Sequence, residues 1–155
     1  MQIETWNEEH PRWSEFEACL KSVAPEQAPF VLGDYAAGLP CSLLVALLDD
    51  RVVGFLRFAI QPIGAEEKQP PLGVNEAKIH AFAVHPEARR RGIGTALQRR
   101  AIALAQELGC HQLASHTSYA NGENLRIKLA LGFCAAPDEA GNGIRLFMPL
   151  KTTPR

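Results

Sequence analysis

Apolar residues recur along this chain with two different spacings, and the change between them separates helices from strands. Over residues 13–23, WSEFEACLKSV, they come every three or four positions, which predicts an amphipathic helix. The same spacing predicts a weaker helix over 26–37, a long helix over 93–108 and a further helix over 121–131. The last two end before Gly109 and Gly132, and glycine is common just after a helix.

Unbroken or alternating apolar runs predict strands at 42–48, 52–60, 77–84, 110–117, 133–136 and 144–150. The first two runs are joined by Asp49-Asp50 and the last two by DEAGNG, both of which have turn chemistry. Residues 61–76 hold three prolines and two glycines without periodicity, and unstructured loops of this length are often functional. This order of elements predicts a mixed α/β sheet with helices on its faces.

Length and charge narrow the class of protein. The 155 residues fit one domain, 1–155, and a net charge of -1 gives no general attraction for nucleic acid or a membrane surface. The N-terminus, MQIETWNEEHPRW, lacks the basic start and apolar run of a signal peptide, and no stretch reaches the ~20 apolar residues of a membrane span. The four scattered cysteines indicate buried, reduced thiols, so we expect a cytoplasmic protein without a metal.

The stretch from Val84 to Leu97, VHPEARRRGIGTAL, is a strand end, a basic turn with two glycines, and a helix start. The first N–H groups of a helix bind phosphate readily, and glycines let a ligand approach the backbone. The GxxxxGK[ST] nucleotide loop is absent, and a GxGxxG match starting at Gly92 fails at Leu97. A basic turn without a ligand explains the arginines less well, because cations at a helix N-terminus oppose its dipole.

This stretch closely resembles the acyl-CoA loop of the GNAT superfamily of N-acetyltransferases, which follows a strand ending Val-x-Pro with Gln/Arg-x-x-Gly-x-Gly/Ala. Here the pattern is Val84-His85-Pro86 and then Arg89 to Gly94. A second family pattern, Asn-x-x-Ala-x-x-x-Tyr-x-x-x-Gly-Phe, matches from Asn121 to Phe133, with Asn124 at the alanine position and Lys128 at the tyrosine position. The resemblance covers about residues 42 to 150.

The resemblance implies an α/β (α+β) fold with helices on both faces of a central mixed, mostly antiparallel sheet, and acetyl-CoA as cosubstrate. It implies that the pantetheine arm pairs with the backbone of three strand residues beside a bulge: Phe82, Ala83 and Val84. It further implies that the loop backbone holds the pyrophosphate and that two later asparagines also bind the cosubstrate. These residues are Arg89, Arg90, Arg91, Gly92, Ile93, Gly94, Thr95, Asn121 and Asn124.

Acetyl transfer to an amine requires a neutral amine and a leaving thiolate that is stabilised or protonated. His80 precedes the expected CoA-pairing segment, and an imidazole, with an ordinary pKa of about 6.5, suits a base. A structural strand histidine is the alternative, and Glu76 is a weaker candidate base. Lys128 or Tyr119 is the candidate acid toward the thiolate, although Lys128 also fits a solvent-facing helix position and Tyr119 a packed strand end.

We therefore expect direct attack of a primary amine of a small molecule or peptide on acetyl-CoA in a ternary complex, since no cysteine lies in the loop or the preceding strand. Because Lys128 stands where the family pattern has tyrosine, a non-catalytic acyl-CoA-binding domain is the alternative. The net charge of -1 argues against a nucleic-acid-binding module. Acids near the N-terminus favour a cationic acceptor. Trp6, Trp13 and Tyr35 either line its pocket or belong to the core, and the resemblance also allows a homodimer.

Overall fold

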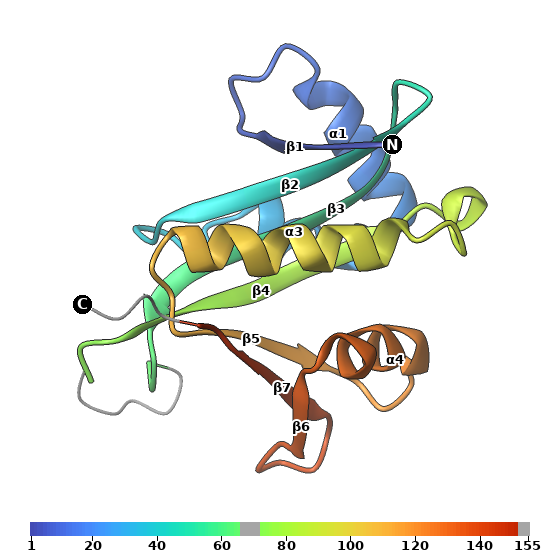
Figure 1. Ribbon diagram of the computed structural model, residues 1–155. Helices are drawn as coiled ribbons and strands as arrows, with labels where there is room; N and C mark the ends of the chain where they lie inside the picture. Colours follow the sequence, from blue (N-terminus) through green and yellow to red (C-terminus); the bar gives the residue numbers. More distant parts are fainter. Residues whose placement is uncertain (66–71, 152–155) are drawn as a thin grey trace. The chain divides into compact units, whose positions relative to one another are not determined.

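A computed structural model describes residues 1–65 and 72–151 (Figure 1). It divides into two compact units, Met1–Ala59 with His80–Ala101, and Ile60–Ile79 with Ile102–Arg155. The chain passes from one to the other within β3 (Arg51–Pro62), β4 (Asn75–Val84) and α3 (Ile93–Glu107). The strand order of the sheet is β1-β2-β3-β4-β5-β7-β6.

The first unit begins with three antiparallel strands. β1 (Gln2–Trp6) pairs with β2 (Cys41–Leu48), which pairs with β3. Asp49 and Asp50, between β2 and β3, both have positive φ, as a tight two-residue hairpin requires. On one face α1 (Trp13–Val23), the single turn η1 (Pro25–Gln27) and α2 (Ala28–Leu32) cover a core that includes Phe16, Leu20, Val45 and Phe55.

The first turns of α3 lie on the opposite face of this unit. A Cβ added to Gly54 would lie 3.4 Å from Leu97 of α3, whereas the next residue, Phe55, packs in the core under α1. Consecutive strand residues point to opposite faces, so helices cover both sides of β3. The expected arrangement of helices on both faces of the sheet is confirmed (Figure 1).

In the second unit, residues 76–78 of β4 pair in parallel with β5 (Gln112–Thr117). β5 pairs antiparallel with β7 (Ile144–Pro149), which pairs antiparallel with β6 (Cys134–Pro137). α4 (Gly122–Leu131) joins β5 to β6, and Gly132 ends it with a φ of 103°. The mixed sheet and the closing hairpin predicted from the sequence are confirmed.

Three sequence expectations were wrong. Residues 2–6 form a strand that we did not predict, because only Trp6 is buried there and the pairing partner lies across the turn on β2. The helix expected over 26–37 ends at Leu32, because Gly33 is extended, with ψ of -174°. Only glycine fits there, since an added Cβ would lie 2.5 Å from the Pro29 carbonyl oxygen. Cys41 and Cys134 are exposed rather than buried, although all four cysteines are free thiols.

Among the described residues, no helix has the length and apolar character needed to cross a membrane. Residues 152–155 and part of the predicted 61–76 loop lie outside the described residues.

Candidate active site

The glycine-containing loop of the first unit joins the end of β4 to α3. A short turn, η2 (Pro86–Ala88), is capped by the His85 ring, whose Nδ1 accepts from the Glu87 N–H at 3.2 Å, and Ala88 is buried. Arg90 and Gly92 then adopt positive φ values of 63° and 77°. These left-handed residues turn the chain so that α3 starts at Ile93.

The backbone at the start of α3 has the donors that an anion requires. The Ala96 N–H donates to the Gly92 carbonyl at 3.0 Å, which makes it the first helical hydrogen bond at this end. The N–H groups of Ile93, Gly94 and Thr95 precede this bond and have no acceptor within the helix. A Cβ on Gly92 would meet nothing within 4 Å, and the side chains of Arg89, Arg90 and Arg91 are exposed around the turn. The loop therefore suits a phosphate-bearing ligand.

β4 departs from regular alternation just before this loop. His80 contacts Arg57 and Tyr35 on the α2 side of the sheet, while the next residue, Ala81, belongs to the core on that same side. Because consecutive residues of a regular strand face opposite sides, β4 must be bulged between His80 and Ala81. Regular alternation along the strand predicted at 77–84 would instead put His80 and Ala81 on opposite faces.

Beyond the bulge, the side chain of Gln27 pairs with the β4 backbone. The Phe82 N–H donates to Gln27 Oε1 at 2.8 Å, and Gln27 Nε2 donates to the Phe82 carbonyl at 3.2 Å. Two residues further, Arg89 Nε donates to the Val84 carbonyl at 3.2 Å. The segment expected to pair with pantetheine thus has side chains bonded along it.

His80 is held by an aromatic ring and lies beside a cation. The Tyr35 ring meets its ring edge-on at 4.8 Å between centroids. Arg57 Nη1 lies 3.5 Å from His80 Nδ1 and also donates to the Phe30 carbonyl at 2.7 Å. A guanidinium only donates, so Nδ1 can act only as the acceptor in this contact, with its lone pair directed at Arg57.

Arg57 also lines a cavity of about 380 Å³ in the first unit. Trp6, Trp13, Val31 and Leu43 form its apolar wall, and Glu8 and Glu9 contribute exposed carboxylates. Of the three aromatic residues proposed from the sequence as pocket or core, Trp6 and Trp13 serve both purposes, because they line the cavity and pack against the core. Tyr35 is exposed and contacts His80 instead.

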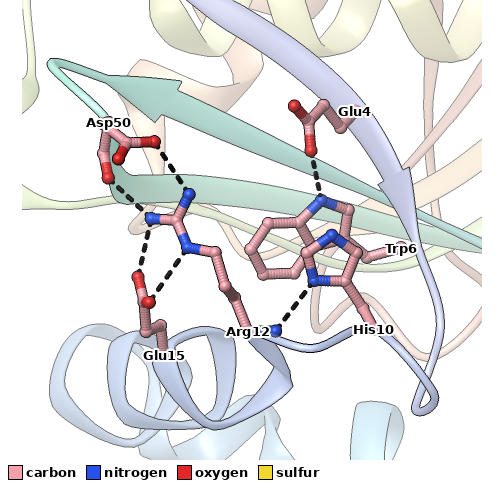
Figure 2. A network of polar contacts seen from close by, with 6 residues as sticks. All are labelled: Glu4, Trp6, His10, Arg12, Glu15 and Asp50. Carbon is pink, nitrogen blue, oxygen red and sulfur yellow. Dashed lines mark hydrogen bonds and ion pairs between the residues drawn. The ribbon is translucent and has the colours of Figure 1, made fainter.

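The segment that carries Glu8 and Glu9 is anchored at both ends, as Figure 2 shows. On one side the His10 ring stacks on Trp6 at 3.8 Å, and Trp6 Nε1 donates to Glu4. On the other side Arg12 donates to both carboxylate oxygens of Glu15, to Asp50 Oδ1 at 2.8 Å and to the Asp50 carbonyl. Hydrogen bonds from Arg12 hold the pKa of Glu15 below its ordinary value. The cavity rim between these anchors is thus fixed in position.

In the second unit, a buried lysine belongs to a short chain of polar side chains. Lys128 is 1% exposed, and its Nζ donates to Asn124 Oδ1 at 2.6 Å. Asn124 Nδ2 donates in turn to Thr117 Oγ1 at 3.3 Å, and Asn121 caps α4 by accepting from the Asn124 N–H. Burial lowers the pKa of Lys128 from 10.5 to about 7. The solvent-facing alternative for Lys128 was wrong, and so was the apolar face predicted for this helix, since Leu129 is exposed.

The two other candidates differ sharply in their surroundings. Glu76 is 6% exposed, and its two carboxylate oxygens accept from Gln61 Nε2 and Gln112 Nε2, each at 2.8 Å. A carboxylate bound by two amides in this way anchors β4 to its neighbours, and both of its oxygens are engaged by other side chains. Tyr119, in the turn before α4, is 59% exposed. Within the described residues, no cluster of metal-binding side chains occurs.

Sequence reasoning did not single out Gln27 or Arg57 for this site. Gln27 lies 55 positions before its partner Phe82, and Arg57 lies on a strand that the sequence marked only as apolar. Neither residue type carries a local signal for such a role, so only the fold shows it.

The chain is similar to known acetyltransferases in sequence and in fold. Residues 4–133 match the model of the acetyltransferase (GNAT) family. The chain is 34% identical over 109 residues to an aminoglycoside N(6')-acetyltransferase type 1 from Klebsiella aerogenes, covering 70% of this chain and 68% of that protein. It is similar in fold to the GNAT domain of S. lividans PAT (TM-score 0.74, 18% identity, 96% of this chain and 89% of that one). It is also similar to a GNAT acetyltransferase from Elizabethkingia anophelis with acetyl-CoA bound (TM-score 0.68, 18% identity, 96% and 97%).

Proposed function

The chain belongs to the acetyltransferase (GNAT) family and is an N-acetyltransferase, and we propose that it transfers the acetyl group of acetyl-CoA directly to a primary amine in a ternary complex. The observation that carries the proposal is the loop from Arg89 to Thr95, where left-handed residues and the start of α3 present backbone N–H groups between three arginines. The pyrophosphate of acetyl-CoA matches these donors in charge and in hydrogen-bonding capacity.

In this proposal, His80 takes the proton that the attacking amine must lose. An alkylamine with a pKa near 10.4 is almost entirely protonated at neutral pH, so a base is needed before or during attack. The His80 ring lies beside Arg57, which lines the cavity of the first unit, so a base at this position is close to an amine bound in the cavity.

Lys128 protonates the departing thiolate of coenzyme A in this proposal. A free thiol has a pKa of about 8.5, so a lysine with an ordinary pKa would hold its proton too tightly to act as an acid toward it. Burial brings the pKa of Lys128 to about 7, which makes transfer of its proton to a thiolate favourable. This lowered pKa supports Lys128 over the exposed Tyr119 as the acid. The lysine that replaces the tyrosine of the family pattern then has a catalytic role, which favours an enzyme over a non-catalytic acyl-CoA-binding domain.

We propose that the acceptor is a small amine with more than one ammonium group. Glu8 and Glu9 give the cavity rim negative charge, and Trp6 and Trp13 give it aromatic walls, which together favour cations that carry apolar carbon. The K. aerogenes relative is an aminoglycoside N(6')-acetyltransferase, and aminoglycosides have this multiply cationic character. Linear polyamines share it.

Neutralising the rim tests the acceptor class. We expect Glu8→Gln with Glu9→Gln to raise the KM for a polycationic amine by roughly 3- to 10-fold, since exposed ion pairs each contribute a modest free energy, while kcat stays near the wild-type value. The assay is free-thiol release from acetyl-CoA with spermidine and with an aminoglycoside. Glu123→Gln, on the exposed surface of α4, is the matched control. An equal KM in all three proteins would contradict a cationic acceptor held by this rim.

A further inference from the structure

The edge of β4 that the cosubstrate is proposed to use is bonded to protein side chains. The His85 N–H donates to the Val53 carbonyl of β3 at 2.7 Å. Because N–H and C=O directions alternate along an extended chain, the backbone groups of Val84 and Phe82 point away from β3. The Val84 carbonyl accepts from Arg89, and both polar backbone groups of Phe82 are bonded to Gln27. On this edge of β4, the backbone is therefore hydrogen-bonded to a side chain at both Phe82 and Val84.

Gln27 presents one acceptor and one donor to Phe82, which is what a neighbouring peptide or amide would present. The pantetheine arm carries secondary amides, each with one N–H and one C=O. A primary carboxamide at 2.8 and 3.2 Å from the Phe82 backbone thus makes the pair of hydrogen bonds that an added strand-like ligand makes. Both cannot occupy the Phe82 backbone at once.

We propose that Gln27 is a placeholder for the cosubstrate: its carboxamide occupies the Phe82 backbone in the free enzyme and leaves when the pantetheine arm binds. This inference rests on the proposed function, since it assumes that acetyl-CoA pairs with β4. Gln27 is the last residue of η1 and is half-buried, so rotation of its side chain releases Phe82 without moving the core residues of α1.

The placeholder has a measurable consequence, because acetyl-CoA must break two hydrogen bonds to bind. Removing the carboxamide should therefore tighten acetyl-CoA binding instead of weakening it. We expect Gln27→Ala and Gln27→Met to lower the Kd for acetyl-CoA by about 3- to 10-fold, as loss of neutral hydrogen bonds in the competing free state implies. A residue that holds β4 in shape for the ligand would give the opposite sign.

Titration calorimetry with acetyl-CoA on the full chain separates these outcomes, with Gln2→Ala on β1 as a control that makes the same substitution at an exposed position. Gln27→Met keeps the bulk of the side chain, so tighter binding in both Gln27 variants assigns the effect to the hydrogen bonds. Hydrogen exchange supplies a second measurement: without ligand, the Phe82 amide should exchange faster in both variants than in the wild type, and with acetyl-CoA all should be equally protected.

Unchanged or weaker binding in either Gln27 variant overturns the placeholder while the proposed function stands. If the wild-type protein shows no binding of acetyl-CoA, the proposed function fails first and the placeholder with it.

Discussion

Replacing Lys128 with methionine is expected to produce a slower enzyme that is more stable. The reaction slows because the departing thiolate loses its acid. We expect kcat to fall by roughly 10- to 100-fold, at or below the lower end of the usual effect of a general acid, because a thiolate leaves without help more easily than an amine or alkoxide. Lys128→Arg keeps a positive charge but cannot release its proton, so it should be as slow as Lys128→Met if proton transfer is the role.

The gain in stability depends on pH in a direction set by the depressed pKa. The pKa of Lys128 is about 7 in the folded chain and its ordinary value is 10.5, so below pH 7 folding must bury a charged ammonium. The stability of the wild type therefore rises from pH 7 toward pH 10.5, as the unfolded chain holds a proton that the folded one has lost. Lys128→Met should raise the free energy of unfolding by about 2 kcal/mol at pH 6 and by less at pH 9, measured by urea denaturation.

The pH–rate profile distinguishes an acid from a packing residue. Activity that needs protonated Lys128 falls as pH rises above about 7, the pKa of that group. Lys128→Tyr, which restores the residue of the family pattern, should move this fall toward the ordinary tyrosine pKa of about 10. If Lys128→Met leaves kcat and the alkaline side of the profile as they are in the wild type, the acid assignment is wrong, whatever its effect on stability.

Replacing His80 with alanine is expected to cause the larger loss of turnover. A positioned base contributes typically 10²- to 10⁴-fold, and we expect kcat to fall by about 10²-fold or more. The Kd for acetyl-CoA should be unchanged, because the role proposed for the ring is proton transfer and not binding of the cosubstrate. The acidic side of the pH–rate profile should disappear, since no imidazole remains to be protonated. Steady-state thiol release between pH 5 and 9 measures both effects.

His111→Ala is the matched control, since His111 is exposed and the hydrogen bonds seen for it are made by its backbone, to Asn75 and Leu150. A small amine such as imidazole added to His80→Ala should restore part of the activity if the missing function is proton uptake. A variant with reduced kcat and an intact acidic side of the profile would instead assign His80 to holding Arg57 and Tyr35 in place.

The sequence pattern predicted elements whose burial follows a simple period. Helix α1 matched the predicted range of 13–23, because its apolar residues repeat every three or four positions and its buried side is formed by them. The loop from Arg89 to Thr95 was located because glycines at fixed spacing and a following helix are local features. The backbone donors expected in that loop are the first N–H groups of α3, so their position follows from the start of the helix at Ile93.

The same pattern failed where polar side chains are buried. Lys128 and Gln98 are both fully enclosed, although periodicity assigns such residues to the surface, and their burial is a property of what packs over the helix. The bulge at His80 and Ala81 reverses the facing of the residues after it, which no alternation rule anticipates. Gln27 and Arg57 reach the site across long stretches of chain, so their roles depend on tertiary contacts.

The most direct test of acetyl transfer to an amine is to incubate the purified chain with acetyl-CoA and spermidine. The acetylated amine is followed by mass spectrometry and the released thiol by absorbance. We predict one acetyl group on a primary amine of spermidine for each free thiol released, with release that depends on the amine concentration. Thiol release at the same rate without any amine, or binding of acetyl-CoA with no transfer to spermidine, an aminoglycoside or a peptide amine, would contradict the account.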